Sequence, residues 1–176
     1  MSRILRNIND IQIFNIKKYS DSRGEFYENF NIQNFDYKIK QSNISISKRN
    51  VLRGIHYQIN QPIGYIITVI EGSIFDFAID LRKDSKSFLK KYTFKLDKNS
   101  DQNIYIPAGF GHGFLCLSSY CIVNYLCDEN YNINYERGIN CFDKTFNIDW
   151  PLKDVILNER DKEFPEFASL SPDQLP

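Results

Sequence analysis

Short runs of β-branched and aromatic residues recur along this chain at regular spacing, separated by turn-forming segments. No long amphipathic helical pattern interrupts them. Several short strands spaced in this way are typical of an all-β sandwich or barrel. The runs that we expect to form strands are residues 11–19, 25–30, 65–72, 73–81, 87–96, 103–118 and 121–131.

The segments between these runs predict how the strands are connected. Gly72, between two apolar runs, predicts a tight hairpin, and residues 81–87 read as a polar loop. A short helix is expected at residues 31–37. After Trp150 the alternation is lost, which predicts a wrapping C-terminal segment with a short helix near residues 158–164. With no repeat or linker, residues 1–176 are expected to form one domain.

Charge and composition exclude several classes of protein. Lys plus Arg and Asp plus Glu each number 22, so the net charge is zero and nothing favours nucleic acid as a partner. The N-terminus lacks the apolar core of a signal peptide, and no apolar run is long enough to span a membrane. We therefore expect a cytoplasmic protein. Its cysteines form no CxxC pair and are expected to be reduced core thiols: Cys116, Cys121, Cys127 and Cys141.

The chain has two histidines, His56 in "NVLRGIHYQ" and His112 in "IPAGFGHGF". The second segment, P-x-G-x-x-H, matches half of the second cupin motif. A metal-binding cupin usually offers H-x-H in its first motif, but here the position two residues after His56 is Gln58. Two histidines without clustered carboxylates fall short of a typical transition-metal site. Three readings stay open: structural histidines, a metal site, and acid–base or binding groups on a metal-free scaffold.

A resemblance to a known family covers nearly the whole chain. The segments that carry it occur in family order: "DSRGEFYENF", "QSNIS", "NVLRGIHYQ", "GSIFDFAIDLRKDSKSF", "IYIPAGFGHGFLCLS", "NYLCDENYNINYERGI" and "IDWPLKDVILNERD". In these segments the chain resembles the dTDP-4-dehydrorhamnose 3,5-epimerases. The resemblance implies a cupin fold, that is, a double-stranded β-helix (jelly-roll) small barrel. It also implies a homodimer with exchanged N-terminal strands, and neither a metal nor another cofactor.

The same resemblance assigns the catalytic residues. A 4-keto sugar has acidic protons at C3 and C5, because the ketone can hold the resulting charge as an enolate, so a base and an acid suffice. His56 matches the base, and a neutral imidazole suits that task near neutral pH. Asp161 matches the carboxylate that orients the base, and Tyr125 the acid on the opposite face.

Further positions match residues that bind the nucleotide sugar in the family. Arginine forks suit the diphosphate, and Tyr131 matches a tyrosine that stacks on the nucleotide base. Tyr65 departs from the family, which has lysine there; its hydroxyl could replace the lysine near the 4-oxygen. The expected binding residues are Arg23, Glu28, Gln41, Asn43, Arg53, Tyr65, His112, Tyr131, Glu136 and Arg160.

These matches predict an epimerase acting at C3, C5 or both on a nucleotide-diphospho-4-keto-deoxysugar destined for surface polysaccharide. Several alternatives stay open. They are an enzyme that acts at one centre, or on a GDP- or CDP-linked sugar or a heptose; a 3,4-ketoisomerase; a non-catalytic cupin that binds sugar nucleotides; and a metal-dependent cupin.

Overall fold

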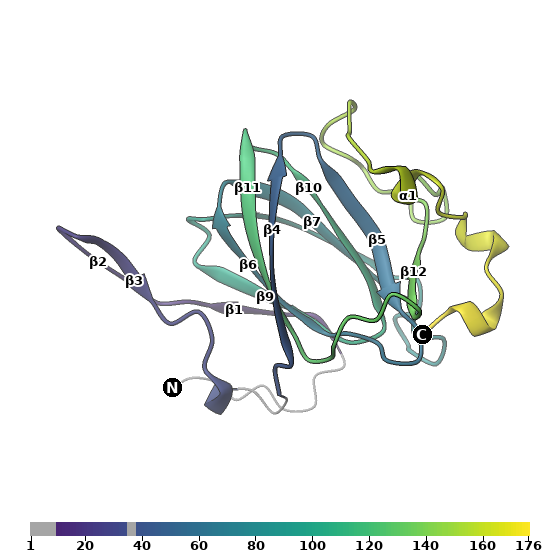
Figure 1. The fold of residues 1–176 in the computed structure, drawn as a ribbon, viewed down its shortest axis with the longest axis horizontal. Helices are drawn as coiled ribbons and strands as arrows, with labels where there is room; N and C mark the ends of the chain where they lie inside the picture. The colour runs from purple at the N-terminus through teal and green to yellow at the C-terminus, as the bar shows by residue number, and fades with distance from the viewer. Residues whose placement is uncertain (1–9, 35–37) are drawn as a thin grey trace.

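Two antiparallel five-stranded sheets face each other and enclose the core in the computed structural model, which describes residues 10–34 and 38–176 (Figure 1). The first sheet runs, in spatial order, β1 (Gln12–Asn15), β9 (Gln102–Ile106), β6 (Tyr65–Glu71), β11 (Tyr120–Cys127) and β4 (Gln41–Lys48). The second runs β12 (Glu136–Gly138), β5 (Leu52–Gln58), β10 (Phe110–Cys116), β7 (Ser73–Asp80) and β8 (Lys91–Asp97).

Inward-facing apolar side chains from both sheets form one buried cluster between them. Ile67 and Val123 come from the first sheet, and Ile74, Phe110 and Phe114 from the second. Strand alternation places such residues on one face of each sheet, so two facing sheets can bury them together. The all-β sandwich or small barrel expected from the sequence is confirmed.

Most of the expected strands are present, with changed ends. Residues 103–118 form β9 and β10, joined by the expected turn at Pro107–Gly109. Residues 11–19 divide between β1 and β2 (Lys18–Asp21). The expected strand at 87–96 begins only at Lys91, because Ser85 and Ser87 both donate hydrogen bonds to the Asp80 carboxylate and hold the preceding loop in turns.

The hairpin between β6 and β7 turns at Gly72, as expected. This residue has φ +79°, a conformation that L side chains rarely adopt. A Cβ there would also lie 2.2 Å from the carbonyl oxygen of Tyr120. Glycine is therefore required for the hairpin that brings β6 and β7 into opposite sheets.

A second hairpin, β2 with β3 (Gly24–Tyr27), projects away from the barrel (Figure 1). It exposes Tyr19 and Phe26, the latter 73% accessible. The expected helix at residues 31–37 is represented by a 3-10 turn, η1 (Ile32–Asn34), and residues 35–37 lie outside the described part.

The C-terminal segment wraps the outer face of the second sheet, as expected (Figure 1). It contains α1 (Glu159–Lys162), η2 (Phe167–Ser169) and η3 (Pro172–Gln174). Asn158 caps α1 by accepting a hydrogen bond from the Asp161 backbone N–H. Trp150 packs edge-on against Phe77 at 4.9 Å between ring centroids, which fixes the segment to β7.

The four cysteines are buried and unpaired, as expected. Burial raises the pKa of Cys141 to about 12, so this thiol stays protonated at neutral pH. Within the described ranges, no helix has the length and apolar character needed to cross a membrane.

Candidate active site

A cavity of about 330 Å³ between the two sheets gathers most of the expected site residues. Its volume lies within the usual range for small-ligand sites. The second sheet contributes Arg53 and His56 from β5 and His112 from β10, while the first contributes Tyr65 and Tyr125. The other lining residues are Asn43, Ser45, Gly113, Phe114, Tyr131, Glu136 and Arg160.

His56 is paired with Asp161. The distance from His56 Nε2 to Asp161 Oδ1 is 2.9 Å, and the second carboxylate oxygen accepts a hydrogen bond of 3.2 Å from the Gly54 N–H. Asp161 is buried at the start of α1. The cap at Asn158 thus places a carboxylate directly behind the His56 ring.

Electrostatics fix the proton arrangement in this pair. Burial alone raises the pKa of Asp161, but its interactions with His56, Gly54 and Arg160 outweigh burial and bring the pKa below its usual value. An ionised carboxylate only accepts hydrogen bonds, so His56 Nε2 must carry the proton. The neutral imidazole then has its lone pair on Nδ1, as a base requires.

A second histidine–aspartate pair lies beside the first. His112 is directly opposite His56 in the β10–β5 register, and its Nε2 lies 2.9 Å from Asp76 Oδ2. Both side chains of this second pair are buried. Sequence reasoning missed Asp76, although a carboxylate at an inward position between Ile74 and Ala78 on an alternating strand was a usable signal.

Two phenols from the first sheet complete the inner wall. The Tyr65 ring centroid lies 5.6 Å from that of His112 and 6.3 Å from that of Tyr125. Burial raises the pKa of both tyrosines, and nearby ionisable groups, Cys127 first among them, raise that of Tyr65 further. Both phenols therefore stay protonated and can donate a hydrogen bond or a proton.

Charged and aromatic residues meet at another part of the wall. Tyr131 Oη donates to Glu136 Oε2 at 2.6 Å, and Arg160 Nη1 donates to the same oxygen at 2.5 Å. Gln41 accepts from the Tyr131 backbone N–H and donates to Asn43, both at 2.9 Å. Gln41 thus supports the wall without lining the cavity.

Gln58, at the position where a metal-binding cupin has its second histidine, has a structural role. It is buried, accepts from the Asn132 N–H at 2.6 Å and donates to the Gln61 carbonyl at 2.6 Å. Among the residues that the structure describes, no group of three or more His, Cys, Asp or Glu side chains is placed to hold a metal ion.

Two expected binding residues lie apart from the cavity in the single chain. Arg23 is in the turn of the β2–β3 hairpin, where it pairs with Asp21 at 2.6 Å with its side chain 89% exposed. Glu28 accepts a hydrogen bond from Asn31. Neither residue lines the cavity, so within one subunit the structure does not bring them to the other site residues.

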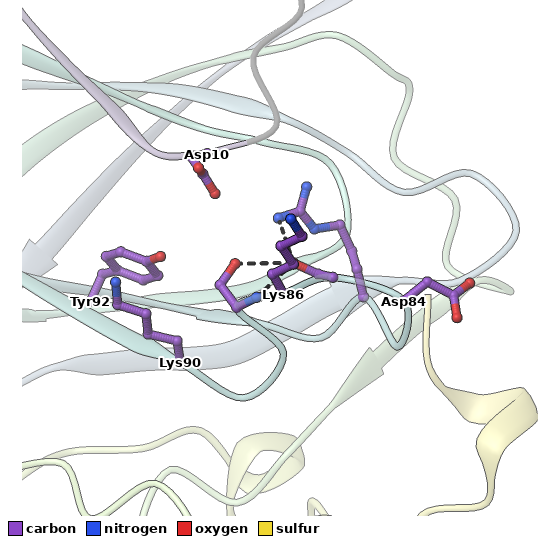
Figure 2. Close-up of a pocket in the computed structure, with 8 residues that line it drawn as sticks. Asp10, Asp84, Lys86, Lys90 and Tyr92 are labelled. Carbon is purple, nitrogen blue, oxygen red and sulfur yellow. Dashed lines mark hydrogen bonds between the residues drawn. The ribbon is translucent and has the colours of Figure 1, made fainter.

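A larger cavity, of about 650 Å³, lies at the β7–β8 connection (Figure 2). Asp10, Asp84, Lys86, Lys90 and Tyr92 surround it together with the loop that follows Asp80, and neither histidine is present. At this cavity the charged groups stabilise the loop, because the buried Asp80 carboxylate accepts hydrogen bonds from Arg82, Ser85 and Ser87. The smaller cavity, with its paired imidazoles and phenols, is therefore the candidate active site.

Comparison with known proteins gives one consistent result. The family model described as dTDP-4-dehydrorhamnose 3,5-epimerase matches residues 6–169. A curated relative of that name from Methanothermobacter thermautotrophicus is 43% identical over 154 residues, covering 83% of each chain.

Solved structures of sugar epimerases also superimpose on this chain. A dTDP-6-deoxy-D-glucose-3,5-epimerase from Legionella pneumophila, in complex with dTDP-4-keto-L-rhamnose, superimposes with a TM-score of 0.91 at 33% identity, covering 98% of this chain and 96% of that one. A 3'-monoepimerase from Streptomyces bikiniensis, in complex with dTDP-quinovose, gives a TM-score of 0.84 at 28% identity over 96% and 88% of the two chains.

Proposed function

The chain belongs to the dTDP-4-dehydrorhamnose 3,5-epimerase family, and we propose that it inverts C3 and C5 of a dTDP-linked 4-keto-6-deoxy sugar by deprotonation and reprotonation. The observation that carries this proposal is the placement of His56 and Tyr125 in opposite sheets around one cavity. Epimerisation requires a proton to leave from one face of the sugar and to return on the other.

His56 is the base in this proposal. Its Nδ1 lone pair accepts the C3 or C5 proton, and Asp161 stabilises the imidazolium that forms. Tyr125, held neutral by burial, returns a proton to the opposite face. Both groups need only correct placement and a suitable protonation state, so their chemistry calls for no cofactor.

The enolate oxygen requires hydrogen-bond donors. The Tyr65 phenol faces the same cavity and supplies one. His112 lies beside it in the cavity and is held by Asp76 through Nε2. Preorganised donors at a developing negative charge contribute roughly 3 kcal/mol each to transition-state stabilisation.

The diphosphate and nucleotide are assigned to the charged and aromatic part of the wall. Arg53 and Arg160 line the cavity and suit phosphate oxygens. Tyr131 offers a ring for the base. Gln41, Asn43 and Glu136 hold these groups in place through the hydrogen bonds described above.

We further propose a homodimer in which the β2–β3 hairpin, and Glu28 directly after it, reach the partner's site, so that Arg23 and Glu28 act there. The hairpin projects from its own barrel (Figure 1) and exposes Phe26. β4, an edge strand of its sheet, exposes Ile44 and Ile46 at 66% and 67%. Apolar residues on an unpaired edge favour association.

A nucleotide-sugar substrate also favours a cytoplasmic location and a role in surface polysaccharide synthesis.

Inversion at C3 alone is the second candidate. Two observations favour it: the similarity to a 3'-monoepimerase, and Tyr65 at the position where the family has lysine. A neutral phenol stabilises an enolate less than a cation does. An enzyme with the weaker donor would then complete only the easier of two deprotonations.

Proton exchange in D₂O, followed by NMR, tests both candidates. The substrates are dTDP-4-keto-6-deoxyglucose and its GDP and CDP counterparts. Deuterium at C3 and C5 of the dTDP sugar supports the main proposal, and deuterium at C3 alone supports the second. Migration of the ketone to C3 would indicate a 3,4-ketoisomerase. Binding of the nucleotide sugar without any proton exchange would support the non-catalytic cupin.

A further inference from the structure

The His56 ring is contacted by a second residue besides Asp161. Phe164 lies against it, with ring centroids 5.5 Å apart and ring planes at 80°. Asp161 and Phe164 are separated by only two residues, so one short stretch of the C-terminal segment supplies both contacts. Phe164 does not line the cavity and has no role in the chemistry proposed above.

The place that Phe164 occupies exists because residue 138 is glycine. A Cβ at Gly138 would lie 2.2–2.4 Å from three atoms of the Phe164 ring. Gly138 does not have the positive φ that by itself would favour glycine. Space for the ring is therefore the reason for glycine here. In the β12–β5 register Gly138 is directly opposite His56, so the ring is placed over both residues.

The position of Phe164 is fixed from several sides. The Arg160 guanidinium lies 5.8 Å from the centre of its ring, and that guanidinium is itself held by Glu136. Immediately after Phe164, the Pro165 carbonyl accepts a 2.9 Å hydrogen bond from the Asn140 N–H. The segment that carries Phe164 is thus tied to the chain beyond β12.

A single hydrogen bond does not fix the orientation of an imidazole. The bond from Nε2 to Asp161 sets one ring atom, and the ring plane can still tilt about it. A working base must be held within about 0.5 Å and 10–20° of the productive geometry. The edge-on contact with Phe164 restricts this remaining motion.

We propose that Phe164, seated on Gly138, is a positioning residue that fixes the plane of the His56 ring for proton abstraction. This inference rests on the proposed role of His56 as the base. Phe164 acts through His56, without touching the substrate.

Steady-state kinetics of Phe164→Ala, Gly138→Ala and the double variant test this inference. Phe164→Ala is expected to lower kcat about tenfold or more and to leave KM within about twofold, because His56 loses its orientation while Arg160, which lines the cavity, keeps its bond to Glu136. Gly138→Ala displaces the ring and should have a similar effect. In the double variant the alanine at 138 has no ring to displace, so kcat should fall no further than in Phe164→Ala.

Two controls separate this effect from a general loss of stability. Phe167→Ala removes an aromatic ring of the same segment that packs on Phe88 and Phe146 instead of His56. It should lower the melting temperature and leave kcat unchanged in the folded protein. If Phe164→Ala leaves kcat unchanged, or if the two losses at 138 and 164 multiply in the double variant, the inference is overturned.

His56→Asn distinguishes failure of this inference from failure of the proposed function. If His56→Asn retains full exchange, His56 is not the base and the proposed function fails. If His56→Asn abolishes exchange while Phe164→Ala has wild-type kcat, only the positioning role fails. In the His56→Asn background, Phe164→Ala should lower the residual rate no further, because its effect passes through His56.

Discussion

His56 Nε2 lies 2.9 Å from Asp161 Oδ1, although 105 positions separate the two residues in the chain. One belongs to β5, an inner strand of the second sheet, and the other to a four-residue helix in the wrapping segment. The proposed base and its proposed orienting carboxylate therefore meet only when the C-terminal segment closes over β5.

Replacing Asp161 with Asn should lower kcat by about 10²-fold or more. The amide keeps the size of the side chain but loses the charge that fixes the tautomer of His56 and stabilises its imidazolium. Deuterium exchange at C3 and C5 measures the loss. Wild-type exchange in a folded Asp161→Asn variant, checked by circular dichroism, would contradict the pairing as a catalytic one.

Tyr125→Phe should separate exchange from inversion. His56 can still remove a proton and return deuterium to the same face, while the donor on the other face is gone. Deuterium incorporation should persist as the yield of epimer falls about 10²-fold. If exchange and inversion fall together, Tyr125 acts in the first step, and its assignment as the second-face acid is wrong.

Tyr65→Phe should lower kcat by about 10²-fold, the usual effect of losing one donor to a developing oxyanion. Tyr65→Lys tests the C3-only alternative, because it restores the cation of the family. If the wild type exchanges only C3, the lysine variant should gain exchange at C5. Unchanged rates in Tyr65→Phe would show that its hydroxyl does not contact the enolate.

Asp80 predicts a pH dependence of stability. Burial alone raises its pKa, but hydrogen bonds from Arg82, Ser85 and Ser87 outweigh it and lower the pKa to about 2. Because the folded pKa is below the unfolded one, the stabilisation is present above about pH 4 and is lost as the pH falls toward 2. It is on the order of 2 kcal/mol.

Urea unfolding of Asp80→Asn at pH 7 and pH 3 tests this dependence. The difference in unfolding free energy from wild type should be smaller at pH 3. Asp84→Asn is the matched control, since Asp84 is an exposed carboxylate of the same loop. A difference that stays constant between the two pH values would argue against an ionised Asp80 as the stabilising group.

Arg23 predicts complementation between two impaired subunits. Arg23→Ala should raise KM about tenfold and leave the fold intact, because Arg23 lies in an exposed turn and pairs with Asp21 of the same hairpin. Mixed dimers of Arg23→Ala and His56→Asn subunits would combine an intact His56 with the partner's intact Arg23. Exchange of hairpins should therefore restore one wild-type KM site per mixed dimer. If the mixed dimers contain no site with wild-type KM, Arg23 does not act in the partner's site.

The local pattern of the sequence was sufficient for the fold class and most strands. Alternation of apolar residues is a property of neighbouring positions, and Gly72 and the Pro107–Gly109 turn depend on local backbone geometry. Strand ends were less predictable. At residues 87–90 the buried carboxylate of Asp80 holds the chain in turns. The alternation of apolar residues along the chain does not reveal that contact.

The expected site residues came from the order of the family motifs, and the cavity gathers nine of them: Asn43, Arg53, His56, Tyr65, His112, Tyr125, Tyr131, Glu136 and Arg160. Local pattern and family resemblance therefore determined the sheet architecture and the chemical types present. Apart from the pair of His56 with Asp161, which the resemblance implied, tertiary structure alone decided which partners these groups have. It paired His112 with Asp76, assigned Gln58 to the loop and placed Phe164 on His56 through the space at Gly138. The physical reason is that protonation and orientation depend on contacts within a few ångströms, and these contacts join positions far apart in the chain.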